Sequence, residues 1–112
     1  MGRSTYVFRA ELRLDDATDP RAPGGAVTTA LCGHWEHEGA CRWPHNNAID
    51  PASAPAHFRT VFVADDADAE AVHAQIDSAL RSATGWSVIS AGAGTPHGAE
   101  LSLGSRLASG TD

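Results

Sequence analysis

The residues of this chain that are best suited to chemistry are crowded between Cys32 and His45. This segment reads CGHWEHEGACRWPH and holds both cysteines, three of the six histidines and two of the three tryptophans. Thiolate and imidazole groups are the ligands that zinc prefers, usually four of them in a tetrahedral arrangement. The composition of the segment therefore predicts a transition-metal site, with zinc as the metal.

Five side chains in this segment are candidate ligands. One set of four leaves several residues between successive ligands, enough for a loop to fold around a single ion. This set is Cys32, His37, Cys41 and His45. His34 competes with His37, because a single helical turn would place both imidazoles on the same side. Four polar neighbours are candidates to orient the imidazole rings through hydrogen bonds. They are Glu36, Glu38, Asn46 and Asn47.

Four interpretations of the segment remain open. A closed site of two thiolates and two imidazoles would be structural, in a small zinc-binding protein with a binding or accessory role. An open coordination position would make the protein an enzyme, with Glu36 or Glu38 as general base toward a metal-bound water. Without a metal, Cys32 and Cys41 would form a reversible disulfide in a thiol redox protein. In the fourth interpretation these side chains only pack a loop.

The composition argues against several classes of partner. The chain has 112 residues, a formal net charge of −6 and eight basic residues, all of them scattered arginines. They form no basic stripe, so neither nucleic acid nor an anionic membrane surface is an expected partner. No apolar run approaches the ~20 residues of a membrane span, and no signal-peptide core is evident. We therefore expect a cytoplasmic protein, and the exclusive use of arginine suggests a GC-rich bacterial genome.

Hydropathy periodicity predicts the elements that position the segment. Residues 5–14 alternate between apolar and polar side chains, which predicts a half-buried strand. A connection rich in proline and glycine follows over 15–25. A second strand is predicted over 26–32, so that the candidate ligands would begin at its end. Residues 46–56 are expected to be irregular, and residues 57–64 form a third predicted strand.

The second half of the chain is predicted to begin with a helix. Asp65 or Asp66 is expected to cap this helix, whose apolar residues recur at helical spacing. The apolar stripe consists of Ala69, Val72, Ile76, Ala79, Leu80 and Ala83. The later segments are a strand over 86–91, a strand over 99–103 and a flexible tail over 105–112. His57, His73 and His97 are expected to be structural or exposed.

Together these elements predict an α+β fold in one domain over residues 1–112. We expect an antiparallel-rich sheet of four to five strands with one main helix packed on one face. The nearest common architecture is a ferredoxin-like sandwich, whose second helix the segment 34–56 would supply. The strand–helix–strand unit over 58–91 fits a parallel crossover. The other face of the sheet would need a cover, which favours a homodimer.

Overall fold

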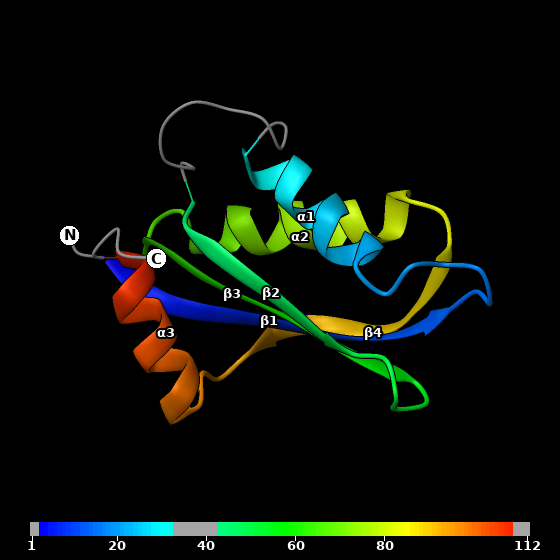
Figure 1. Ribbon diagram of the computed structural model, residues 1–112. Coiled ribbons are helices and arrows are strands. Elements are labelled where there is room, and N and C mark those ends of the chain that lie inside the picture. Colours follow the sequence, from blue (N-terminus) through cyan, green and yellow to red (C-terminus); the bar gives the residue numbers. More distant parts are fainter. Residues whose placement is uncertain (1–2, 33–42, 109–112) are drawn as a thin grey trace.

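The computed structural model describes residues 3–32 and 43–108 of the chain, which form four strands and three helices (Figure 1). In chain order they are β1 (Arg3–Leu14), α1 (Ala22–Cys32), β2 (His45–Asp50), β3 (Ala56–Asp65), α2 (Ala69–Ser82), β4 (Trp86–Gly94) and α3 (Gly98–Ala108). Among these residues, no helix is long and apolar enough to cross a membrane.

The four strands form one antiparallel sheet in the order β2-β3-β1-β4. β1 lies between β3 and β4, so these two strands run in the same direction, as the predicted crossover through α2 requires. α1 and α2 lie on one face of the sheet, and α3 lies on the other (Figure 1). The order β1-α1-β2-β3-α2-β4 is the ferredoxin-like connectivity. The predicted α+β class is therefore confirmed, with three helices in place of the one main helix expected.

The strand predicted over residues 26–32 is wrong, because this stretch belongs to α1. Val27 and Leu31 are both buried, and their spacing of four residues fits one face of a helix as well as one face of a strand. Pro23 and the glycines after it, which suggested a loop, form the first turn of α1, where proline is tolerated. α1 also supplies the second helix of the ferredoxin-like fold, which we had expected from the segment 34–56.

The irregular stretch predicted over residues 46–56 is wrong in its first half, where β2 pairs with β3. His45, Asn47 and Ile49 lie opposite residues of β3 that face the helices. Two of these three positions are polar, so the usual alternation of apolar and polar residues is missing.

The last predicted strand, over residues 99–103, is also wrong, because these residues lie in α3. Only Glu100 and Gly104 of this helix are buried, so α3 lacks an apolar stripe that would reveal it. Of the predicted flexible tail, residues 105–108 belong to α3 and residues 109–112 lie outside the described part.

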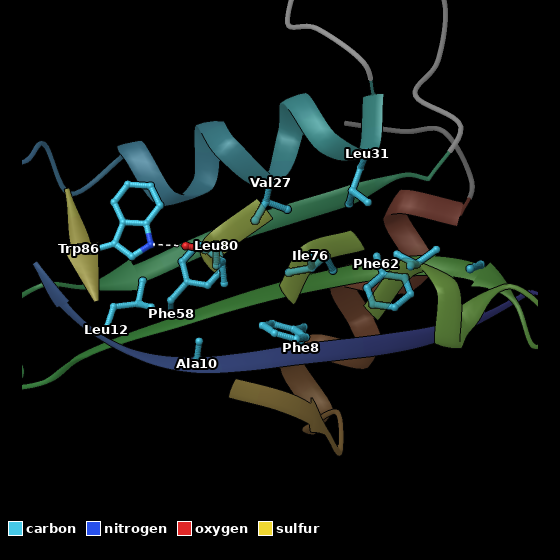
Figure 2. Packing of buried hydrophobic residues seen from close by; sticks show 12 residues of the cluster. Phe8, Ala10, Leu12, Val27, Leu31, Phe58, Phe62, Ile76, Leu80 and Trp86 are labelled. Atoms are coloured by element: carbon cyan, nitrogen blue, oxygen red, sulfur yellow. Dashed lines mark hydrogen bonds between the residues drawn. The ribbon is translucent and has the colours of Figure 1, made fainter. Parts of the chain in front are cut away.

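The hydrophobic core lies between the sheet and the pair α1 and α2. One face of β1 contributes Phe8, Ala10 and Leu12, as its alternation predicts. Figure 2 shows Val27 and Leu31 of α1 pointing from above toward the layer that holds Ile76. At one end of the core, the indole nitrogen of Trp86 donates a hydrogen bond of 2.9 Å to the Leu80 carbonyl (Figure 2).

The predicted helix after the third strand is confirmed as α2. Four residues of its predicted stripe are buried: Ala69, Val72, Ile76 and Leu80. The predicted cap is wrong, because Asp68 occupies the capping position and its side chain makes no capping hydrogen bond within the described residues. Gly85 has a φ of +108° in the turn that leads into β4, a conformation that favours glycine.

Candidate functional site

The structure places the two ends of the predicted metal segment. Cys32 is the last residue of α1, and His45 is the first residue of β2. His34, His37 and Cys41 lie outside the described residues, as do Glu36 and Glu38. Among the described residues, no group of three or more His, Cys, Asp or Glu side chains is arranged to hold a metal ion. The predicted ligand set thus stays a prediction, and His45 is the one member whose side-chain geometry can be examined.

Both ring nitrogens of His45 have hydrogen-bond partners. Nδ1 lies 3.0 Å from the carbonyl oxygen of Trp43, and Nε2 lies 3.0 Å from the hydroxyl of Thr28. A carbonyl only accepts, so Nδ1 carries the proton and Nε2 accepts from the Thr28 hydroxyl. Burial lowers the pKa of His45, against the opposing effect of the bond to Trp43. The imidazole is therefore neutral near pH 7, with its lone pair on Nε2.

Asn47 extends this arrangement into a network that joins α1, β2 and β3. Its side-chain amide donates to the Thr28 hydroxyl at 3.1 Å and to the Gly24 carbonyl at 3.0 Å. Its side-chain oxygen accepts from the hydroxyl of Thr60, which is fully buried, at 2.6 Å. Asn47 was predicted to orient an imidazole, and it holds the threonine that contacts His45. Asn46 faces the other side of the sheet, where its side-chain and carbonyl oxygens accept from Arg59.

The network holds the start of β2 against α1. Cys32 follows Thr28 by four residues, so it lies one helical turn further along α1. Thr28 in turn contacts His45. The two ends of the predicted metal segment therefore lie on neighbouring elements that are joined by hydrogen bonds.

A second polar cluster, on the opposite face of the sheet, was not predicted from the sequence. Arg9 donates two hydrogen bonds to the carboxylate of Glu100, of 2.7 and 3.0 Å. Arg59 lies beside Arg9 on the neighbouring strand, with its Nε 3.6 Å from the same carboxylate. The backbone N–H of His97, which precedes α3, donates to Glu100 at 2.8 Å. One carboxylate thus joins α3 to two strands.

The burial and the charges of this cluster explain its electrostatics. The Glu100 side chain is 10% exposed and lies between two guanidinium groups. Hydrogen bonding to Arg9 lowers the pKa of Glu100 to about 2, with a further contribution from the His97 N–H. A glutamate at the third position of a helix that bonds the capping residue is half of a capping box. That signal was hidden, because His97 replaces the usual serine or threonine.

The remaining histidines occupy the kinds of place that were expected. His57 and His97 are exposed. His73 packs against Tyr6, Phe8 and Phe62, and its Nδ1 is buried without a hydrogen-bond partner in the described part of the chain. Burial lowers the pKa of His73. This unpartnered nitrogen has a stability cost, which is the basis of a prediction below.

Comparison of the chain with protein-family models, with curated proteins and with solved structures finds no match. The function therefore has to be argued from the residues of this chain.

Proposed function

We propose that the protein binds one transition-metal ion, zinc by preference, through the segment between Cys32 and His45. The candidate ligands are Cys32, His34, His37, Cys41 and His45. The observation that supports the proposal is the hydrogen-bonded attachment of β2 to α1, since Thr28 and Asn47 hold the residues that flank the segment. A loop whose two ends are held together loses less conformational entropy when it closes around an ion.

The state of His45 is compatible with a role as ligand. A neutral imidazole whose Nδ1–H bonds a backbone carbonyl, with its lone pair on Nε2, is the form that usually binds metals. Metal binding at Nε2 would replace the Thr28 hydroxyl. Such a hydrogen bond contributes about 1 kcal/mol net, against about 10–16 kcal/mol for a structural zinc site. The competing bond is therefore too weak to prevent binding.

Elemental analysis of the untagged protein tests this proposal. We expect roughly one equivalent of zinc per chain, and its loss in Cys32→Ser and in Cys41→Ser. His57→Ala is the matched control, because this exposed histidine lies in β3, outside the segment, and its removal should leave the metal content unchanged. Less than about a tenth of an equivalent in the intact chain would overturn the proposal.

The role of the ion follows from a second measurement. We favour a closed site of four protein ligands, because the segment offers two thiols and three imidazoles. After cobalt exchange, the absorption spectrum of a closed tetrahedral site would support the structural or binding role. A five-coordinate spectrum would support the enzyme, with Glu36 or Glu38 as general base. Metal-free protein that loses two thiols reversibly would instead be a redox protein.

A further inference from the structure

The face of the sheet that carries α3 is only partly covered by this helix. Beyond α3, a trough of about 510 Å³ lies over the strands β3, β1 and β4. Two rows of side chains cross its floor. Arg59 and Arg9 stand in one row with Gly92, and His57 and Glu11 stand in the next row with Ser90. The trough lies on the opposite face from His45 and is separate from the proposed metal segment.

The trough is hollow because β4 contributes only small residues to this face. They are Ser90, Gly92 and Gly94. Gly94 has a reason within the fold, because a Cβ there would lie 2.8 Å from Nε of Arg9. Gly92 has none, since a Cβ there would meet no described atom within 4 Å. Among the described residues, Gly85 alone has a positive φ, so backbone conformation does not require Gly92 either.

A glycine inside a strand is unfavourable by roughly 0.5–1 kcal/mol relative to alanine. Where the fold does not need it, such a glycine often marks a place that a ligand or another backbone approaches closely. Gly92 lies on the floor of the trough and is exposed. Its position therefore indicates that something packs directly on the backbone of β4.

The polar groups around Gly92 indicate what that ligand carries. Nη1 of Arg59 bonds Asn46, whereas its Nη2 has no hydrogen-bond partner among the described residues. Glu100 neutralises one of the two arginines, which leaves one positive charge in this row. In the next row Glu11 accepts a hydrogen bond of 2.9 Å from Ser90, and its other oxygen lies 3.8 Å from His57. The trough thus presents a cationic row and an acidic row.

The two rows are two residues apart along the strands, which is roughly 6.7 Å. We propose that the trough over Gly92 binds a small carboxylic acid that also carries a hydrogen-bond donor several bonds from its carboxylate. The carboxylate contacts Arg59, whose guanidinium matches its geometry. The ligand chain lies on the backbone at Gly92, and the donor contacts Glu11.

Nuclear magnetic resonance titration with three matched probes tests this proposal. 4-Aminobutyrate carries both groups, butyrate carries only the carboxylate, and butylammonium carries only the donor. We expect saturable shifts of the backbone amides of Ser90–Gly94 with 4-aminobutyrate, about tenfold weaker binding of butyrate, and weaker binding still of butylammonium. No saturable shift with 4-aminobutyrate would overturn the proposal, as would equal affinity for all three probes.

Two variants connect the binding to the trough. Gly92→Val places a branched side chain on the floor and should weaken binding of 4-aminobutyrate by at least about tenfold. Gly98→Ala is the matched control, because a Cβ there also meets no described atom within 4 Å but lies at the start of α3, outside the lining of the trough. Unchanged affinity in Gly92→Val would refute the assignment. Concentration-dependent dimerisation that Gly92→Val abolishes would also refute it, and would assign the trough to a second copy of the chain. The zinc content of both variants should equal that of the unmodified protein.

Discussion

The attachment of α3 to the sheet depends on a single carboxylate, and Glu100→Gln tests this attachment directly. Glutamine keeps the size of the side chain and removes its charge. The two guanidinium groups of Arg9 and Arg59 would then face each other across neighbouring strands without a compensating carboxylate. Like charges directly opposite on a sheet are destabilising, so we expect the variant to unfold more easily.

The size of the effect follows from the pKa of Glu100, which falls from an ordinary 4.5 to about 2 in the folded protein. One pKa unit corresponds to about 1.4 kcal/mol, so the whole shift corresponds to about 3 kcal/mol. Arg9 is 37% exposed, and solvent screens its interaction with Glu100. We therefore expect Glu100→Gln to lower the free energy of unfolding at pH 7 by about 1–2 kcal/mol.

The pH dependence has a defined sign. The folded pKa of Glu100 lies below its unfolded value, so its contribution is complete above about pH 4.5 and is lost as the pH falls toward about 2. The difference in stability between the original protein and Glu100→Gln should therefore shrink from pH 6 to pH 3. Working with this difference cancels the other carboxylates, including Asp19, whose pKa Arg21 also lowers to about 2.

Urea denaturation followed by tryptophan fluorescence measures this difference, since Trp86 lies in the core. Glu70→Gln is the matched control, because Glu70 also lies in the first turn of a helix but is exposed. Its loss should cost about 0.5 kcal/mol through the helix dipole alone. The reasoning is refuted if Glu100→Gln matches the control at pH 7, or if its effect is the same at pH 3 and pH 6.

Three further substitutions have defined outcomes. Gly104→Ala should lower the stability by about 1–3 kcal/mol in thermal denaturation, because the new Cβ would overlap the side chain of Thr5; Thr5→Ala should restore only part of this loss, since the Cβ of residue 5 would still lie 2.7 Å away, and full stability of Gly104→Ala would contradict the close packing of α3. His73→Leu should reduce the loss of stability that the protein undergoes as the pH falls below about 6.5, because burial lowers the folded pKa of this histidine beneath its unfolded value and protonation then favours unfolding; urea midpoints at pH 7.5 and pH 5 that fall equally in both proteins would contradict it. Asn47→Ala should cost about 2–3 kcal/mol, because it leaves the buried hydroxyl of Thr60 without its acceptor; a second change, Thr60→Val, should recover part of that loss, and a purely additive double variant in urea denaturation would contradict the coupling.

Four elements could be predicted from the sequence because each buries one face against the core. β1 and β3 show the alternation of a strand, and the buried residues of α2 recur at helical spacing. β4 follows a glycine with positive φ and begins with the buried Trp86. In each case the period of the apolar residues is a local property, which neighbouring residues along the chain are sufficient to reveal.

The other three elements escaped prediction because polar contacts across the fold hold them in place. β2 turns His45 and Asn47 toward the helices, where Thr28 and Thr60 satisfy them. α3 docks through Glu100, and it owes its position to an arginine 91 residues earlier. In α1 the spacing of Val27 and Leu31 fits both a helix and a strand, and packing against α2 decides between them.

The sequence by itself determined the α+β class and the concentration of metal-binding side chains between Cys32 and His45, because composition and periodicity are properties of the linear chain. The tertiary structure alone decided which distant residues meet. The strand order brings Arg59 beside Arg9, and α3 adds the carboxylate that they share. The same order places Gly92 on an open floor between a cationic and an acidic row. Such contacts depend on how strands pair, and strand pairing leaves no local period in the sequence.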